Sequence, residues 1–330
     1  MLPETPHLLA VRHAVRAWLD RHGGTAVAVA LSGGADSLAL TAAAVAEASS
    51  VRALIVDHGL QAGSTAVAAE AAERARALGC VDASVLPVTV GTSGGLEAAA
   101  RKARYDALET ARGDLPVLLG HTLDDQAETV LLGLARGSGG RSIQGMRDYD
   151  EPWGRPLLAV RRATTHAVCV DLGLRPHHDP HNDSPDFTRV RLRQEVLPLL
   201  EDVLGGGVAA ALARTAHQLR DDGDVLDRSA EDLLGAARRG DELDVTVLAS
   251  TPPALRRRVV RLWLLAGGAK VLTDKHIRGV DDLIVAWRGQ GGVAVPGGST
   301  GSRLVASRSR GRLTMGLESN GLQIDSRAID

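Results

Sequence analysis

Aromatic residues and cysteines are the scarcest components of this sequence. Only 2% of its 330 residues are aromatic, and it contains two cysteines. Cys80 and Cys169 lie far apart in the sequence, which excludes a CxxC redox pair, a cysteine-rich zinc site and a disulfide framework. We therefore expect any chemistry that the chain carries to work without sulfur.

The sequence also lacks long hydrophobic runs. The longest apolar stretches, such as residues 26–31 and 130–135, are interrupted well before the ~20 residues that a membrane helix requires. Residues 1–4 lack the basic start and apolar core of a signal peptide. We therefore expect a cytoplasmic protein that has no membrane partner.

The remaining composition is typical of a globular protein. Hydrophobic residues make up 44% and charged residues 24% of the chain, and a domain size of ~150 residues predicts two domains. The net charge of −2 hides a bias, because residues 251–330 carry 13 Lys and Arg against 6 Asp and Glu. This basic region suggests contact with a polyanion, although a solvated surface explains the charge equally well.

The first half of the chain alternates short apolar strands with helical patterns. Each predicted strand is rich in Val, Leu and Ala, and each is followed by a turn signal. The strands are expected at 26–31, 52–57, 84–88 and 117–120, and the helices at 37–47, 64–78, 96–110 and 125–134. This order predicts an α/β fold whose parallel sheet is covered on both faces and binds ligands at the carboxyl ends of its strands.

The second half has a different character. A helix is predicted at 192–204, although Pro198 makes its end uncertain. Gly205-Gly206-Gly207 marks a hinge, and we place the domain boundary there, between residues 1–205 and a smaller, mainly helical domain at 206–330. In that domain we expect helices at 208–237, 253–265 and 273–287, and short strands, ending in a hairpin, at 293–295, 302–307 and 312–316.

One loop carries a specific chemical signal. Ser32-Gly33-Gly34-Ala35-Asp36-Ser37 follows the first predicted strand directly and opens a helix. Its two glycines allow close approach to a phosphate, the helix N-terminus supplies amide groups, and Asp36 can hold Mg²⁺. The loop lacks the lysine of a Walker A motif, and the plainer alternative is a helix cap.

The SGGxDS loop resembles the pyrophosphatase loop of enzymes that split ATP between its α and β phosphates. Three further segments narrow the resemblance: 56–60 (VDHGL), 95–105 (GLEAAARKARY) and 120–129 (GHTLDDQAET). With 136–139, 155–158 and 182–198, they are similar to the tRNA(Ile)-lysidine synthetase family. The resemblance covers most of residues 26–200, and 255–292 resembles the family's substrate-binding domain more loosely. The chain is shorter than members that carry an additional C-terminal domain.

A cluster of carboxyl groups opens the helix predicted after the fourth strand. Asp124 and Asp125 lie four and three residues before Glu128, so one helix face presents three acids. Such groups repel one another unless a cation joins them, and a lysine ammonium or Mg²⁺ would serve. The alternative is a set of acids that the helix dipole favours.

Several basic residues have both a functional and a plain interpretation. Arg101 and Arg104 share a helix face suited to phosphates or a base, or form a solvated surface. Arg189, Arg191 and Arg193 would align in an extended segment and splay in a helix. The group His177, His178, Asp179, His181 and Asp183 imitates a metal site, but a solvent-exposed loop is the better interpretation.

The resemblance implies the ligation of L-lysine to the wobble cytidine of a tRNA(Ile) with a CAU anticodon. ATP adenylates the C2 oxygen of the cytosine, pyrophosphate leaves, and the lysine ε-amine displaces AMP. The resemblance assigns ATP binding to Ser32, Gly33, Gly34, Ala35, Asp36, Ser37, His58, Arg104, Gly120 and His121. Lysine binding falls to Asp124, Asp125 and Glu128, catalysis to Asp36, Asp125 and Glu128, and a Mg²⁺ contact to Asp36.

Contact with tRNA is expected in two places. By resemblance, Arg189, Arg191 and Arg193 bind the substrate. In the basic C-terminal region, contacts to the tRNA backbone are expected from a set that includes Arg256, Arg257, Arg258, Arg261, Lys275 and Arg278. The alternative is that these side chains simply cover a helical surface. A homodimer is left open.

The sequence departs from the family pattern at Thr122, where many members have histidine, at His181, where serine is usual, and at Val190, where asparagine is usual.

Three rival functions are compatible with the same SGGxDS loop. A tRNA thiolase would need cysteines near the loop, where Cys80 and Cys169 are not expected. A small-molecule amide ligase would need no basic C-terminal domain, and a non-catalytic nucleotide-sensing or tRNA-binding protein would not need the intact carboxyl cluster.

Overall fold

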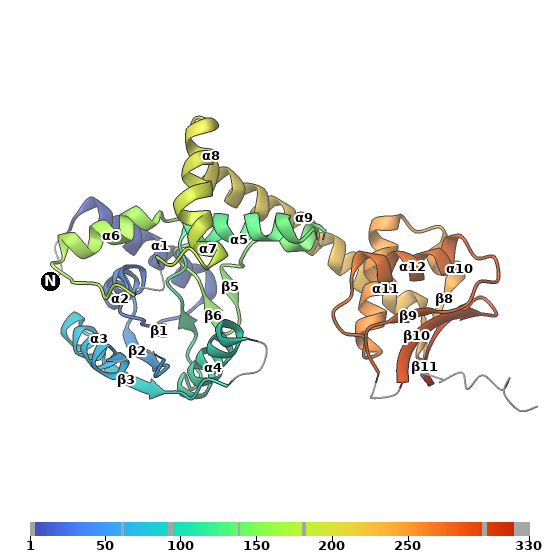
Figure 1. Ribbon diagram of the computed structural model, residues 1–330, viewed down its shortest axis with the longest axis horizontal. Coiled ribbons are helices and arrows are strands. Elements are labelled where there is room, and N and C mark those ends of the chain that lie inside the picture. Colours follow the sequence, from blue (N-terminus) through green and yellow to red (C-terminus); the bar gives the residue numbers. More distant parts are fainter. Residues whose placement is uncertain are drawn as a thin grey trace, which may run out of the picture. The chain divides into compact units, whose positions relative to one another are not determined.

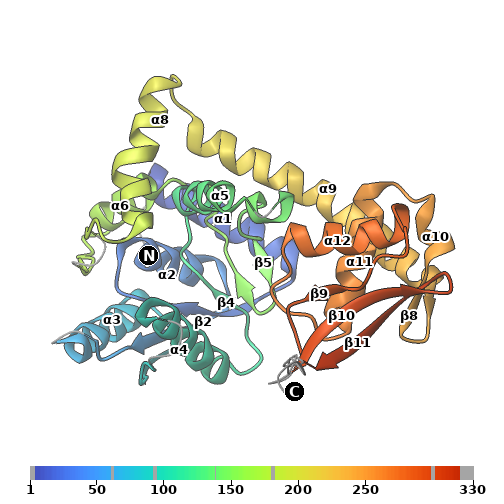
Figure 2. The same cartoon turned by 45° about the vertical axis from the view of Figure 1, so that its right-hand side comes forward.

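The computed structural model describes residues 4–60, 63–91, 95–137, 139–179, 183–298 and 302–319. The chain divides into two compact units, drawn in Figures 1 and 2. Unit 1 contains residues 1–135 and 145–216, and unit 2 contains residues 136–144 and 217–330. The domain boundary that we place between residues 205 and 206 stays a prediction.

Unit 1 is built on a six-stranded sheet of order β3-β2-β1-β4-β6-β5, in which only β5 is antiparallel to its neighbour. Its strands are β1 (Ala26–Ala30), β2 (Ser50–Asp57), β3 (Asp82–Pro87), β4 (Val117–Leu118), β5 (Tyr149–Asp150) and β6 (Trp153–Gly154). The helices are α1 (Pro6–His22), α2 (Ala35–Glu47), α3 (Ser64–Leu78), α4 (Leu96–Ala111), α5 (Leu123–Arg136) and α6 (Arg162–Asp171). The predicted parallel α/β fold is confirmed.

Alternation along the strands explains why both faces of this sheet are covered. Val27 and Val29 of β1 belong to a core cluster that also takes residues from α1, α2, α3 and α6. Ala28 and Ala30, one residue out of phase, pack with Leu108 of α4. Because successive side chains of a strand point to opposite faces, four consecutive apolar residues of β1 contribute to two cores. The carboxyl ends of β1 and β4 are left open for a site.

The chain after this sheet is helical for longer than expected. Helix α7 (Thr188–Arg191) continues through a π-helical turn (Leu192–Val196) into α8 (Leu197–Val203). Pro198 does not end the helix, because it lies in the first turn of α8, where proline is tolerated. Gly205, Gly206 and Gly207 then all have positive φ values, and the Glu201 carboxylate accepts the amides of Val208 and Ala209 at the start of α9 (Val208–Ala237).

Unit 2 combines helices with an antiparallel sheet of order β7-β8-β11-β10-β9. The strands are β7 (Arg238–Arg239), β8 (Glu242–Asp244), β9 (Val293–Val295), β10 (Ser302–Ser309) and β11 (Arg312–Ser319), and the further helices are α10 (Val245–Ala249), α11 (Pro253–Ala266) and α12 (Asp274–Val285). The predicted hairpin is present as β10 and β11, and β7 and β8 extend its sheet. Trp263, Leu264, Leu283 and Leu313 are buried in one core between these helices and the sheet.

No single helix of the described residues is both long and apolar enough to cross a membrane, although the bent pair Thr188–Val203 and Val208–Ala237 satisfies length and composition together.

Candidate active site

The loop between β1 and α2 has the conformation of a phosphate-binding turn. Gly33 has a φ of 82°, in the left-handed region that favours glycine. The Ser37 hydroxyl donates to the Gly34 carbonyl over 2.9 Å and accepts the Ser32 amide over 3.2 Å. These bonds tie the loop to the first turn of α2, whose free amides form the positive end of the helix dipole. The loop is therefore suited to an anion.

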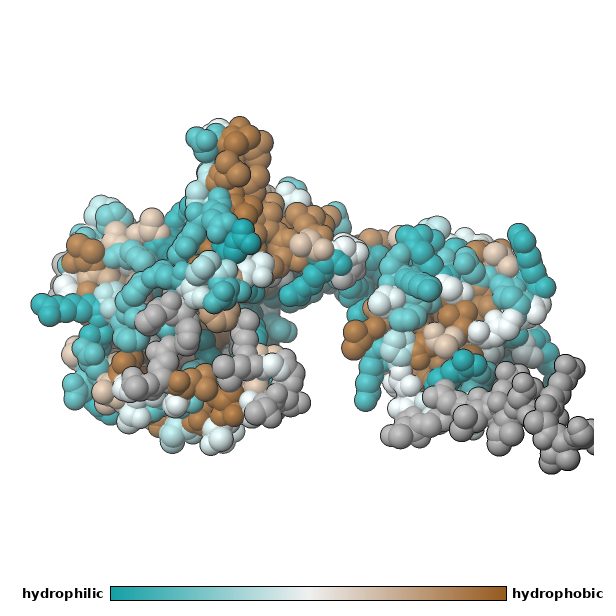
Figure 3. All heavy atoms as spheres, in the orientation of Figure 1, coloured by the Kyte–Doolittle hydropathy of each residue, from teal (hydrophilic) through white to brown (hydrophobic). Residues whose placement is uncertain are grey.

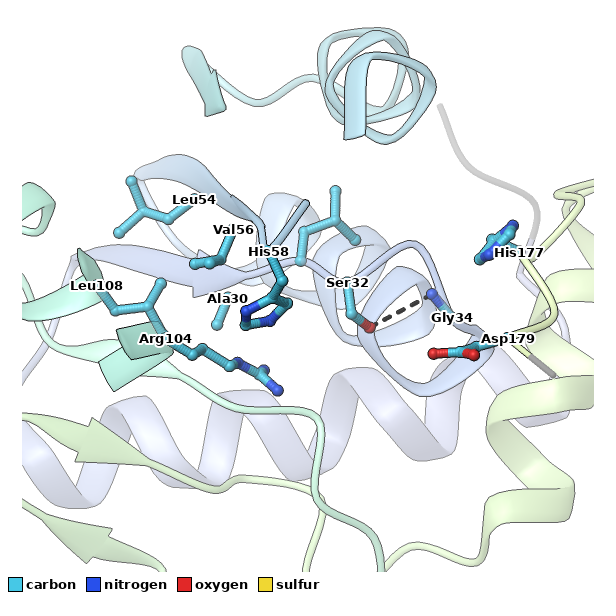
Figure 4. A pocket seen from close by; sticks show the side chains of 11 residues that line it. Ala30, Ser32, Gly34, Leu54, Val56, His58, Arg104, Leu108, His177 and Asp179 are labelled. Carbon is cyan, nitrogen blue, oxygen red and sulfur yellow. Dashed lines mark hydrogen bonds between the residues drawn. The ribbon is translucent and has the colours of Figure 1, made fainter. Parts of the chain in front are cut away.

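A cavity of about 320 Å³ lies beside this loop. Figure 4 shows aliphatic side chains on one side of it and Gly34, His177 and Asp179 on the other. The aliphatic residues include Ala30, Leu54, Val56 and Leu108. The Nδ1 atom of His58 is buried there and has no hydrogen-bond partner among the described residues, and burial lowers the pKa of that ring. An apolar wall next to an anion-binding turn fits a nucleoside joined to phosphates.

A second cavity of about 530 Å³ gathers most of the predicted site residues. It shares Ser32, Gly34 and Arg104 with the first cavity, so the two are adjacent. Arg104 forms no ion pair with any residue in the described part of the chain, which leaves its guanidinium free for a ligand. Of the sequence candidates, the cavity is lined by Ser32, Gly34, Ala35, Asp36, Ser37, Arg104, Gly120, His121, Asp125 and Arg193.

The predicted carboxyl cluster exists, and the side chain that joins it is Arg162 of α6. Its guanidinium is 2.5 Å from Asp125, 3.2 Å from Asp36 and 3.4 Å from Glu128. Its backbone amide also donates to Asp124 over 2.7 Å. The sequence required a cation here, but the expected occupants were lysine or Mg²⁺. An arginine at the first position of a helix opposes the dipole, and that signal could have indicated a tertiary partner.

Two carboxyl groups of the cluster have opposite pKa shifts. Burial raises the pKa of Asp36 above its ordinary value, although a hydrogen bond from Thr165 and the charge of Arg162 oppose it. Burial also acts on Asp125, but Arg162 and the amide and hydroxyl of Thr122 outweigh it and lower the pKa. Asp125 is therefore held ionised, whereas the negative charge of Asp36 is under-compensated.

Thr122, a departure from the family pattern, has a structural role. It is fully buried, and its hydroxyl donates to the Asp125 carboxylate over 2.7 Å. Its amide donates to the same oxygen over 2.8 Å, as in the second half of a capping box at the start of α5. Val190 is buried, and His181 lies outside the described residues.

Arg189, Arg191 and Arg193 lie on a helical segment, so their side chains point in different directions. Arg193 donates to Glu128 over 2.9 Å, and Arg189 lies 4.0 Å from the same carboxylate. Arg191 points elsewhere and pairs with Glu195 over 2.9 Å. Glu128 is fully buried between Arg162 and Arg193, and it is not among the residues that line the cavity. Asp124 lies outside the cavity and pairs with Arg161 over 3.0 Å.

The segment rich in histidine lies nearer the loop than the sequence indicates. The His177 amide donates to the Gly33 carbonyl over 2.9 Å, and the residue lines both cavities. His178 is exposed and pairs with Asp183 over 2.6 Å, as expected of a surface loop. Within the described ranges, no group of three His, Cys, Asp or Glu residues is arranged to hold a metal ion.

Cys169 also lies closer to the loop than expected. Its thiol is 3.5 Å from the Ala35 carbonyl, on the buried side of the loop. Burial raises the pKa of this thiol to about 11, with a smaller contribution from Asp36. Burial likewise raises the pKa of Cys80 to about 11. Both cysteines are therefore thiols at neutral pH, which argues against sulfur delivery by either of them.

We expect His121 to be neutral at pH 7. Burial lowers the pKa of its ring to about 4; the charges of Arg155 and Arg104 lower it further, and the charge of Asp125 opposes them. The unfolded chain binds a proton there near pH ~6.5, so the free energy of unfolding should fall as the pH drops from about 6.5 to about 4. Urea unfolding of the wild type and His121→Gln over this range measures the difference. The variant should lose less stability, and equal losses would contradict the assignment.

These cavities, the loop and the linked carboxylates define an ATP-using enzyme of the PP-loop class, and the PP-loop domain family matches residues 9–200. Residues 243–314 match the TilS substrate binding domain. The chain belongs to the tRNA(Ile)-lysidine synthase family, which consists of ATP-dependent ligases that modify tRNA.

The relatives that show this membership are similar over nearly the whole chain. A tRNA(Ile)-lysidine synthase from Rhodococcus erythropolis is 67% identical over 96% of this chain and 98% of the relative. One from Nocardia farcinica is 69% identical over 92% and 97%. Among solved structures, a U34-tRNA thiolase from Methanococcus maripaludis has a TM-score of 0.53 at 19% identity, covering 64% of this chain and 79% of that chain. That likeness shows the fold alone.

Proposed function

We propose that this protein acts in the cytoplasm and joins L-lysine to the wobble cytidine of a tRNA(Ile) with a CAU anticodon. The C2 oxygen of the cytosine attacks the α-phosphorus of ATP, and pyrophosphate leaves. The ε-amine of lysine then attacks C2, and AMP leaves with the oxygen. The observation that carries this proposal is the shared cavity, in which the phosphate-binding loop faces Asp125 and Arg193. A nucleotide and an amine can meet there.

ATP is proposed to occupy both cavities. The aliphatic cavity takes the adenosine, and the loop Ser32–Ser37 takes the phosphates through its amides and hydroxyls. Arg104, which lines both cavities, is placed to meet a phosphate. His58 and His121 each have a buried Nδ1 atom that no group in the described part of the chain contacts by a hydrogen bond, and ATP could supply one. Gly120, just after β4, allows close approach to the loop, because a Cβ there would lie 3.1 Å from the Ser37 amide nitrogen.

Lysine is proposed to bind through the carboxyl cluster, with Asp125 as the main contact. Asp125 is ionised and lines the cavity, so it can attract an ammonium group. Contact with Glu128 requires Arg162 or Arg193 to move, because these arginines enclose its carboxylate. Asp124 is partly exposed, and Arg161 holds it at the edge of the cluster. The amine must lose its proton before it attacks.

Mg²⁺ fits this site as a companion of ATP. The metal usually takes one or two carboxylates together with substrate phosphates, so no protein cage is needed. Asp36 is the proposed ligand, because it lines the phosphate cavity and its charge is under-compensated. Bound there, the metal would offset the charge that develops on the leaving pyrophosphate.

For the tRNA, Arg189, Arg191 and Arg193 in unit 1 and Arg257 and Arg258 in unit 2 are the proposed contacts. Arg191 is exposed, and within the described ranges its guanidinium pairs with Glu195 alone, so it is the member of the first group that is most available to a phosphate. The exposed apolar side chains of α8, Leu199 and Val203, would support a homodimer. Figure 3 shows this hydrophobic surface along α8.

The test is the incorporation of labelled lysine into a tRNA(Ile) transcript with ATP and Mg²⁺. We expect labelling that requires ATP and releases AMP and pyrophosphate. A transcript with uridine at the wobble position is the matched control and should stay unlabelled. No labelling by a folded protein that binds ATP would contradict the proposal and indicate another amine or base.

A further inference from the structure

A cavity in unit 2 brings four arginines together. It has a volume of about 270 Å³, and Arg257, Arg258 and Arg261 of α11 line it. Arg257 and Arg258 lie four and three residues before Arg261, so all three share one face of the helix. Arg141, from the 3-10 turn Gly140–Ile143, lines the same cavity. Leu272 and Ile277 supply an apolar wall beside α12, which packs along α11 (Figure 2).

The carboxylates near this cavity are too few for its arginines. Arg141 and Arg258 bond to the same Asp227 oxygen, over 2.6 Å and 2.8 Å. Arg257 bonds to Asp281 over 3.0 Å, and Arg256, which is buried, also holds that carboxylate. Asp274 faces the cavity but is paired with Arg278. Asp227 and Asp281 are therefore each shared by two guanidinium groups, and neither forms a bond with Arg261.

Arg261 is left without a partner of its own. In the described ranges of the chain its side chain makes no hydrogen bond and no ion pair, although the residue is half-buried. Burial lowers the pKa of Arg261, the charge of Arg141 lowers it further, and Asp227 offsets this only in part. Holding a guanidinium in such surroundings costs stability unless an anion joins the cluster. The cavity thus has the charge and the donors for an anion, and it is built into the helix packing.

We propose that this cavity binds a phosphate of the tRNA backbone, with Arg261 as its principal contact and Arg141, Arg257 and Arg258 around it. Guanidinium groups bind phosphate oxygens through paired N–H donors, and four of them converge here. The choice of RNA as the source of the phosphate rests on the proposed function. The proposal gives residues 136–144 a task, because Arg141 reaches the cavity from that segment.

The experiment compares tRNA binding by the full-length wild type, Arg261→Ala and Arg303→Ala, without ATP or lysine. Arg303 is the matched control, because it is an exposed arginine of unit 2 that pairs with Glu318 over 3.0 Å, outside the cavity. Dissociation constants for a labelled tRNA(Ile) transcript are measured from about 50 to 200 mM KCl. Arg261→Ala should weaken binding about tenfold and reduce the salt slope by about one. Arg303→Ala should change both much less.

Thermal unfolding separates this role from a structural one. Removing an unpartnered cation should leave the Tm of Arg261→Ala unchanged or raised, and tRNA should raise the Tm of the wild type more than that of the variant. Arg261→Lys keeps the charge but loses the paired donors, so its affinity should lie between the two. A loss of Tm in Arg261→Ala without tRNA, together with an unchanged tRNA affinity, would show that the arginine is structural.

Two further outcomes would overturn the proposal. If Arg261→Ala and Arg303→Ala bind tRNA equally, the cavity does not hold the backbone. If inorganic phosphate raises the Tm in an Arg261-dependent way while tRNA affinity is unchanged, the cavity takes a small anion instead. Failure of the proposed function has a different signature, since tRNA binding would depend on Arg261 while lysine incorporation is absent.

Discussion

Arg162→Ala should abolish measurable lysine incorporation and lower the free energy of unfolding by about 3–5 kcal/mol. The side chain is the only guanidinium in the described structure that contacts Asp36, Asp125 and Glu128 together. Without it, Asp36 and Asp125 repel each other in a buried setting, and Glu128 keeps its bond to Arg193 but loses one partner. Urea unfolding and the lysine incorporation assay measure the two effects.

Arg161→Ala is the matched control for this change. Arg161 is the neighbouring residue, half of its side chain is exposed, and it pairs with Asp124 over 3.0 Å and Glu201 over 3.6 Å. Exposed pairs contribute only about 0–1 kcal/mol, so its loss should be small. Arg162→Lys should recover part of the stability. Equal stabilities for the variants at 161 and 162 would show that Arg162 does not hold the cluster.

Gly120→Ala should reduce turnover on the order of 100-fold and weaken ATP binding. A Cβ at this position would lie 3.1 Å from the Asp36 carbonyl carbon and 3.1 Å from the Ser37 amide nitrogen. Both atoms belong to the backbone of the first turn of α2, which cannot rotate away as a side chain does. The loop would have to shift by a few tenths of an ångström, and misplacement of reacting groups on that scale is costly. Isothermal calorimetry with ATP and steady-state kinetics measure the two effects.

Gly91→Ala provides the comparison for this prediction. A Cβ there would meet nothing within 4 Å, and its φ lies outside the left-handed region. The ATP affinity and turnover of Gly91→Ala should match those of the wild type.

The free energy of unfolding of Gly120→Ala should fall by about 1–3 kcal/mol, as for other overpacked sites. Wild-type kinetics in Gly120→Ala would mean that the loop tolerates displacement and that its fixed position is unimportant for ATP.

Local patterns were sufficient to predict the first four strands of the sheet and the loop after β1. Buried strands and the SGGxDS turn are encoded within a few residues, so β1, β2, β3 and the start of α2 fall within two residues of their expected bounds. The edge pair β5 and β6 was missed, because two-residue strands have no periodicity. The same holds for β7 of unit 2.

The site was harder to predict because its connections are long in sequence. The carboxyl cluster is local and was found, whereas Arg162 joins it from 37 residues beyond Asp125 and 126 residues beyond Asp36. The contact between the His177 amide and Gly33 was missed for the same reason. The orientation of Arg189, Arg191 and Arg193 was left open between an extended and a helical segment, and the helix decides it.

The division of the chain has a consequence for how the protein responds to cleavage. Residues 136–144 belong to unit 2 although both flanking segments belong to unit 1, so the polypeptide passes between the units three times. A protease cut within α9 near residue 216 would therefore not free unit 2. The fragment 217–330 would still be held by residues 136–144, through the bond from Gln144 to the Leu219 carbonyl over 3.0 Å and the ion pair between Arg141 and Asp227 over 2.6 Å. The two fragments should behave as complementing halves of one protein.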